Sequence, residues 1–113
     1  MSDKMLKFIN IGQQTPPKRE VSNRKKDFNE IYKEFINDKA SEQSSRCSQC
    51  GVPFCQVHCP LSNNIPDWLK LTAEGRLKEA YELSQSTNNM PEVCGRICPQ
   101  DRLCEGNCVI EQS

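Results

Sequence analysis

The stretch Cys47-Ser48-Gln49-Cys50-Gly51-Val52-Pro53-Phe54-Cys55-Gln56-Val57-His58-Cys59-Pro60 sets four thiols at the spacing C-x2-C-x4-C-x3-C-P. A second set follows near the end of the chain, and the two sets hold all eight cysteines of the sequence: the later ones are Cys94, Cys98, Cys104 and Cys108. Thiolates repeated this closely select zinc, Cu(I) or iron–sulfur clusters. The proline directly after the fourth cysteine favours iron–sulfur.

The composition predicts a thin hydrophobic core. Of the 113 residues, 35% are hydrophobic even when the cysteines are counted among them. A chain of this length forms one domain, and a domain with so little apolar surface to bury needs another source of stability. Eight metal-ligating cysteines would supply it, so we expect the fold to depend on its metal.

Charge and hydropathy disfavour several classes of protein. Fifteen Lys and Arg residues balance fifteen Asp and Glu residues, whereas nucleic-acid binders carry a basic excess. The sequence has neither an apolar run long enough to cross a membrane nor a signal peptide. We therefore expect a cytoplasmic protein with no nucleic-acid or membrane partner, in which clustered cysteines serve metal or redox sites rather than disulfides.

Residues 1–40 are predicted to form an N-terminal arm followed by an amphipathic helix. Paired prolines at 16 and 17 favour an extended segment over residues 1–21. A helix is predicted over residues 27–38, since Asp27 with Glu30 resembles a capping box and apolar side chains recur at helical spacing. That stripe, expected to face the core, comprises Phe28, Ile31, Tyr32, Phe35 and Ile36.

Residues 41–113 are predicted to form an all-α, ferredoxin-like domain around the cysteines. A short polar helix or turn over residues 41–48 would deliver Cys47 to the site. Two helices are predicted between the cysteine sets, ending near residues 73 and 87, because Gly75 and Pro91 stop them. We interpret them as a helical hairpin that returns the chain to the first set. No strand pattern appears.

The spacing distributes the cysteines over two sites. In two-cluster ferredoxins the cysteine before the proline ligates the other cluster, although those runs have two residues, not four, between the second and third cysteines. The same exchange would give one cluster Cys47, Cys50, Cys55 and Cys108, and the other Cys59, Cys98, Cys104 and, provisionally, Cys94.

Two other chemistries fit parts of the pattern. A structural zinc module would also use four-cysteine sites, but zinc favours C-x2-C pairs, and Cys47 with Cys50 is the single such pair. A thiol enzyme would use Cys55 or Cys59 as nucleophile with His58 as base. Neighbours in sequence rarely adopt that geometry, and eight cysteines exceed what one nucleophile requires.

The residues between the cysteines carry a family resemblance. From about residue 16 to its end, the chain resembles the N-terminal region of the glutamate synthase small (β) subunit, and dihydropyrimidine dehydrogenase and related flavoprotein subunits share a looser version. Besides residues 47–55, the matching motifs are Cys59-Pro60-Leu61, Asn64-Ile65-Pro66-Asp67-Trp68 and Cys94-Gly95-Arg96-Ile97-Cys98-Pro99-Gln100-Asp101-Arg102-Leu103-Cys104-Glu105-Gly106-Asn107-Cys108.

The resemblance implies an electron-transfer domain with two [4Fe-4S] clusters. In that family, electrons pass from NADPH to FAD and through such clusters to the large subunit, which makes glutamate from glutamine and 2-oxoglutarate. The flavin and NADPH domains would lie downstream, and the domain itself would hold no catalytic residue. The alternative within this class is the equivalent domain of another flavin and iron–sulfur oxidoreductase.

The resemblance puts Cys94 in doubt. In the relatives, the fourth ligand of the second cluster is a Gln or Glu oxygen some way beyond the last cysteine. Glu111 and Gln112 have that chemistry but follow Cys108 too closely to match it. Because the sequence stops at Ser113 before any GxGxxG motif, we expect a fragment or excised domain that does not oxidise NADPH alone.

Overall fold

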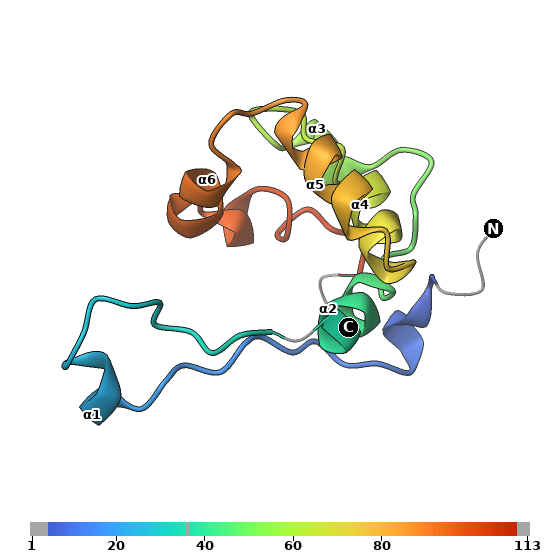
Figure 1. Cartoon of the computed structure of the whole chain (residues 1–113). Helices are drawn as coiled ribbons and strands as arrows, with labels where there is room; N and C mark the ends of the chain where they lie inside the picture. Colours follow the sequence, from blue (N-terminus) through green and yellow to red (C-terminus); the bar gives the residue numbers. More distant parts are fainter. Residues whose placement is uncertain (1–4, 36, 111–113) are drawn as a thin grey trace.

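The computed structural model describes residues 5–35 and 37–110. Within these ranges the regular structure is helical and contains no strand; the one β-type contact is an isolated antiparallel bridge between Lys18 and Tyr32. The prediction of an all-α fold is confirmed. In chain order the elements are η1 (Lys7–Ile9), α1 (Val21–Arg24), α2 (Asn37–Ser44), α3 (Phe54–Val57), α4 (Ile65–Ala73), α5 (Leu77–Gln85), α6 (Pro91–Ile97) and η2 (Gln100–Arg102) (Figure 1).

The predicted helical hairpin is present as α4 and α5, which pack against each other. Pro66 lies in the first turn of α4, where its missing N–H costs nothing. The chain reverses at Gly75, whose φ of 79° is a left-handed conformation that suits glycine. The α5 helix ends at Gln85, near the predicted end at residue 87. Pro91 begins α6, a helix that the sequence analysis did not predict.

The polar helix predicted before Cys47 exists as α2, which begins at Asn37 and ends at Ser44. It therefore starts before the predicted boundary at residue 40. The α2 helix packs on α4, and the hydroxyl of Ser41 donates a 2.7 Å hydrogen bond to the carbonyl of Ala73. This bond fixes the last residue of α4 to the middle of α2.

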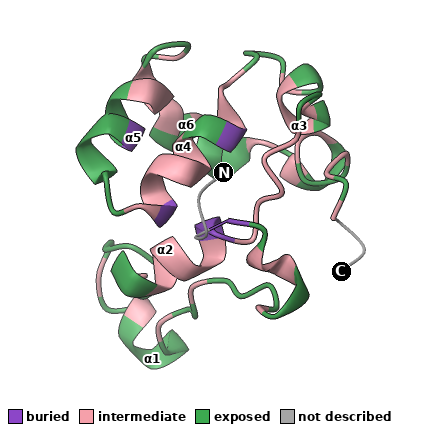
Figure 2. Ribbon diagram, turned by 90° about the vertical axis from the view of Figure 1, so that its right-hand side faces the viewer, coloured by how far each residue is buried: buried purple, intermediate pink, exposed green. Residues whose placement is uncertain are grey.

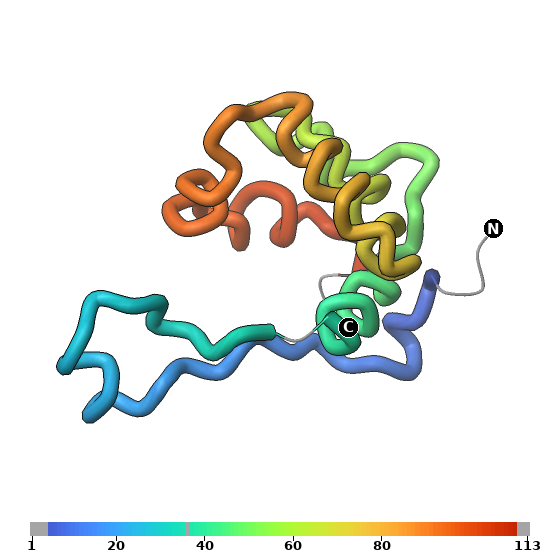
Figure 3. The backbone as a smooth tube through the Cα atoms, in the orientation of Figure 1, coloured from blue at the N-terminus to red at the C-terminus, as the bar shows by residue number. Residues whose placement is uncertain are grey.

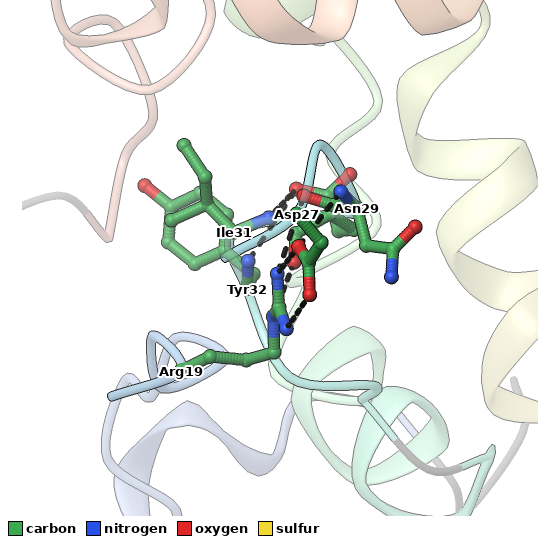
Figure 4. Close-up of polar contacts among 6 residues, drawn as sticks. Arg19, Asp27, Asn29, Ile31 and Tyr32 are labelled. Atoms are coloured by element: carbon green, nitrogen blue, oxygen red, sulfur yellow. Dashed lines mark hydrogen bonds and ion pairs between the residues drawn. The ribbon is translucent and has the colours of Figure 1, made fainter. Parts of the chain in front are cut away.

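The helix predicted over residues 27–38 is absent from residues 27–35, and residues 37 and 38 belong to α2. The Asp27 carboxylate accepts hydrogen bonds from the Arg19 guanidinium at 2.8 and 3.2 Å and from the Asn29 backbone N–H at 3.0 Å, which form a turn instead (Figure 4). Side chains such as Asp compete with helix by bonding nearby backbone in this way. Backbone bonds from Arg19 to the carbonyl of Ile31 and from Lys33 to that of Pro17 then hold two extended segments together.

The apolar stripe on these residues does not face a core. Phe28 is fully exposed, and Ile31 and Tyr32 have exposed fractions of 47% and 43%. Ile36 lies outside the described residues. The prediction that this stripe forms core is therefore wrong for Phe28, Ile31 and Tyr32, whereas Phe35 is half-buried. A short amphipathic sequence becomes helical through packing of its apolar face, and nothing in the described residues covers Phe28.

The extended arm is confirmed around the paired prolines, although η1 interrupts it earlier. It folds back on itself and extends away from the helical body with α1 near its far end (Figures 1 and 3). An ion pair between Glu30 of the arm and Arg96 of α6 connects it to that body.

The core is as thin as the composition predicts. Among the described residues, the buried hydrophobic side chains are Met5, Ala73 and Ala80, joined by buried Ser44 and Ser45. Figure 2 shows the buried positions, in purple, on and beside α2, α4 and α5. Burial of three such side chains is a small driving force, so packing alone does not account for a stable fold.

We predict that the far end of the arm, around residues 19–32, moves away from α6 when the Glu30–Arg96 pair is lost. The start of the arm stays attached, because residues 6–14 make separate hydrogen bonds to residues 43–47. The Arg96 hydrogen bond, followed by that of the Tyr32 N–H, holds the pKa of the Glu30 carboxyl below its usual value. The contribution to stability is thus present at neutral pH and disappears as the pH falls through the pKa of the folded protein. Both side chains are largely exposed, so high salt should also weaken the pair.

Small-angle X-ray scattering measures this directly. Glu30→Gln at neutral pH should increase the radius of gyration and the longest dimension. Glu79→Gln is the matched control, since it removes an exposed carboxylate paired with Arg76 inside the body. An unchanged scattering profile for Glu30→Gln would show that the ion pair does not hold the arm.

Candidate metal centre

Four thiols line one cavity of about 190 Å³ in the helical body. It lies between the end of α2, α3, α4 and the last turns of the described chain. The cysteines are Cys47, Cys55, Cys104 and Cys108, and the apolar part of the wall comes from Ile65, Leu69 and Ile110. The return of the second cysteine set to the first, predicted from the hairpin, is confirmed at this cavity.

Short backbone turns deliver the two cysteines of the first run. Cys47 follows α2, and its N–H bonds to the carbonyl of Ser44 while its own carbonyl accepts from Leu6. Cys55 lies in the first turn of α3, which begins directly after Pro53. Proline suits a helix start because its φ is fixed and it has no N–H to satisfy.

A close backbone contact shapes the turn that carries the second pair. Cys104 and Cys108 flank Gly106, and the Cys108 N–H bonds to the carbonyl of Glu105. A Cβ atom at position 106 would overlap the carbonyl oxygen of Asp101. Glycine is therefore required here by space, not by a left-handed backbone.

Burial makes ionisation of two of these thiols, Cys55 and Cys104, unfavourable. Burial, followed among the raising effects by the neighbouring thiols of Cys47, Cys108 and Cys104, raises the pKa of Cys55 to about 11. Burial also raises the pKa of Cys104, and Glu105 and Cys98 add to it by repulsion. Several thiolates in so small an apolar space repel one another, and bound metal cations would remove that cost.

The cavity joins three members of the first predicted set, Cys47, Cys55 and Cys108, with Cys104, which the spacing assigned to the second. Cys50, predicted for the first set, is not among the lining residues. All eight cysteines are half-buried free thiols. Within residues 5–35 and 37–110, no three Cys, His, Asp or Glu side chains form a group that could hold one metal ion. The assignment of ligands to two clusters stays a prediction.

The donor chemistry fits an iron–sulfur cluster. A lone zinc ion takes its sulfurs about 2.3 Å from a single point. A cluster of four irons takes one thiolate at each iron, and so suits four thiols arranged around a hollow with apolar walls. Glu111 and Gln112, considered as oxygen ligands, lie outside the described residues.

Polar side chains beside the cysteines include contacts that the sequence analysis missed. Three reach sulfur atoms: Gln49 bonds to Cys47, Ser48 lies 3.1 Å from the sulfur of Cys50, and Asn88 donates to Cys94 at 3.1 Å. The contacts of Gln49 and Ser48 could have been expected from the sequence, because both residues lie between Cys47 and Cys50. Asn88 lies six residues before Cys94 and outside both cysteine runs, so no local pattern indicated its contact.

His58 and the nearby arginines have other partners. The His58 Nδ1 atom lies 2.9 Å from the carbonyl of Phe54, and the raised pKa of Cys55 disfavours a reactive thiolate at neutral pH. Arg46 lines the cavity and donates to the carbonyl of Ile11 at 2.7 Å. Arg96 pairs with Glu30.

Comparison with known proteins identifies relatives. The family model described as dihydropyrimidine dehydrogenase domain II, 4Fe-4S cluster, matches residues 24–113. The chain is 70% identical over 112 residues to the glutamate synthase [NADPH] small chain of Azospirillum brasilense, covering 99% of this chain and 23% of the relative. It is 52% identical to the Escherichia coli protein of the same name, covering 97% and 23%. It is 49% identical to the putative oxidoreductase AegA of Escherichia coli, covering 84% and 15%.

Within residues 5–35 and 37–110, no helix is both long enough and apolar enough to cross a membrane. The chain spans less than a quarter of the length of the two glutamate synthase relatives given above.

We predict that Gly106→Ala destabilises the second cysteine turn. The added methyl group would meet the Asp101 backbone, and overpacking of this kind costs about 1–3 kcal/mol. Gly95→Ala is the matched control, because a Cβ there meets nothing within 4 Å. Urea unfolding followed by circular dichroism, with metal content measured in parallel, tests the pair. Equal stability of the two variants would refute the steric requirement.

Proposed function

This chain belongs to the family of 4Fe-4S cluster domains described as dihydropyrimidine dehydrogenase domain II, and we propose that it transfers electrons within an NADPH-dependent glutamate synthase. The observation that carries the proposal is the apolar cavity lined by Cys47, Cys55, Cys104 and Cys108. The names and high identity of the relatives support the choice of enzyme.

The chain's own contribution is to hold and shield the redox centre. Cysteine thiolates would bind the irons, and Ile65, Leu69 and Ile110 would cover the cluster with apolar surface. A bound 4Fe-4S cluster accepts and releases one electron at a time. The guanidinium of Arg46 lines the same cavity, and a cation there favours the more negative, reduced form.

We propose two clusters. One is held by Cys47, Cys50, Cys55 and Cys108; the other by Cys59, Cys98 and Cys104, with an oxygen ligand from a downstream segment in preference to Cys94. Support comes from the exchange of cysteines between runs in two-cluster ferredoxins and from the approach of the two cysteine sets at the cavity. The division into an arm, residues 1–40, and a cluster domain, residues 41–113, belongs to the same proposal.

In this function the domain lies between a flavin and the large subunit. Electrons from NADPH would reach FAD in downstream domains, cross this domain, and enter the large subunit, which forms glutamate from glutamine and 2-oxoglutarate. Another flavin and iron–sulfur oxidoreductase is the second candidate, favoured by the similarity to the oxidoreductase AegA.

Purification without oxygen tests the class of metal. We expect a brown protein with about eight irons and eight labile sulfides, whose helical circular dichroism collapses when the clusters are destroyed. A colourless, zinc-loaded protein would overturn the proposal in favour of a structural zinc module.

We predict different outcomes for two cysteine variants. Cys108→Ala removes a ligand under every assignment considered, so it should lose or convert one cluster, with a matching fall in iron. Cys94→Ala should keep iron near the parent value when the chain is extended by the downstream region of the Azospirillum brasilense relative, which would supply the oxygen ligand. Iron and sulfide counts with electron paramagnetic resonance measure both. Loss of a whole cluster from the extended Cys94→Ala protein would show that Cys94 is a ligand.

We further propose that the arm packs on the rest of the enzyme. Val21, Phe28 and Ile31 line an open, mainly apolar hollow on it, beside the cations Arg24 and Lys25. Isolated exposure of one apolar residue is ordinary, but a contiguous exposed patch marks an interaction site.

Binding to the large subunit tests this role of the arm. We predict that Phe28→Ser weakens binding by roughly tenfold or more, as for a buried aromatic anchor. Tyr81→Ser is the matched control, since Tyr81 is an exposed aromatic residue on α5. Equal affinity of both variants would contradict the docking role of the patch.

A further inference from the structure

We infer that Gln49 is a positioning residue that donates a hydrogen bond to the Cys47 thiolate and thereby raises the reduction potential of the cluster bound there. This inference rests on the proposed function, in which Cys47 is an iron ligand. It goes beyond that function by naming a side chain, which is not itself a ligand, that sets the electronic properties of the centre.

Two N–H groups of the same residue approach one sulfur atom. The backbone nitrogen of Gln49 lies 3.4 Å from the Cys47 sulfur and the side-chain Nε2 lies 3.3 Å from it. Both distances are normal for hydrogen bonds to sulfur, which is a weak and diffuse acceptor. Among the hydrogen bonds described for the cysteines, no other sulfur receives two donors from one residue.

A second contact fixes the orientation of the amide. Nε2 also donates a 2.7 Å hydrogen bond to the carbonyl oxygen of Pro66. A carbonyl can only accept, so the nitrogen and not the oxygen of the amide must face this corner. One amide hydrogen serves Pro66 and the other is left for Cys47.

The backbone at Gln49 supports the same arrangement. Its φ of 52° lies in the left-handed region, which is unfavourable for a residue other than glycine. Pro66, the anchor of the amide, is buried in the first turn of α4. Gln49 therefore keeps an unfavourable backbone conformation, and its side chain is held by a hydrogen bond to buried Pro66 at the start of the helical hairpin.

The chemical consequence follows from charge. Hydrogen bonds to cluster sulfurs shift the reduction potential. A donor stabilises the form with more negative charge on sulfur, which is the reduced form, and so raises the potential. Removing the Nε2 donor should make the potential more negative, while the backbone donor remains.

Two variants separate the side-chain donor from the backbone. Gln49→Met keeps the length of the side chain and removes the donor. Gln49→Gly removes the side chain and adopts the left-handed conformation without strain. Gln56→Met is the matched control, because the Gln56 amide in the same cysteine run donates to Asn64 at 3.1 Å and not to sulfur.

The measurement is a redox titration of the chain purified without oxygen, followed by electron paramagnetic resonance, with iron and sulfide counts for each variant. We expect a more negative midpoint in both Gln49 variants at parental iron content, and the parental midpoint in Gln56→Met. Unchanged midpoints in the Gln49 variants, or an equal shift in the control, would overturn the inference. Loss of iron from both Gln49 variants would also overturn it, because Gln49 would then be structural. A parent with zinc and no iron would refute the proposed function itself, and this result is distinct from the others.

Discussion

Crowding of thiols in an apolar cavity is the constraint on which the rest of this structure depends. Burial and neighbouring sulfurs raise the pKa of Cys55 to about 11, so formation of a thiolate at this position is unfavourable without a nearby cation. Metal cations reverse that balance, since they bind thiolates and neutralise their mutual repulsion. With Met5, Ala73 and Ala80 as the buried hydrophobic side chains of the described chain, ligation and not apolar packing is the larger available source of stability.

The main structural role of the helices is to position the residues that line this cavity, because they bury few apolar side chains between them. The α4–α5 hairpin brings the second cysteine run back to the first, and α4 contributes Ile65 and Leu69 to the cavity wall. The α2 helix ends just before Cys47 and is held to α4 through Ser41. Polar contacts also connect the first cysteine run to α4, because the Gln49 amide donates to the Cys47 sulfur and to the carbonyl of Pro66.

The arm is stabilised by ion pairs and backbone hydrogen bonds and not by helix packing. Its apolar residues have the spacing of an amphipathic helix, yet the Arg19–Asp27 pair and the bridge between Lys18 and Tyr32 fold them into an extended, doubled segment. Phe28 is left exposed. An apolar stripe without a covering surface in the same described chain is consistent with packing against another domain or subunit.

The sequence by itself determined the all-α class and the hairpin between the cysteine runs, because turn residues such as Gly75 act over a few residues. It also predicted that the eight thiols are the metal donors. It could not determine the conformation of residues 27–35, where periodicity favoured a helix and the contact from Arg19 to Asp27 formed a turn instead. Tertiary structure also decided that Cys104 shares a cavity with Cys47, Cys55 and Cys108, and that Gln49 meets both Cys47 and Pro66. The sequence pattern reports the local conformational preference of each segment. The turn at Asp27, the cavity and the contacts of Gln49 depend instead on residues that are distant in sequence and compete for the same hydrogen bonds and the same space.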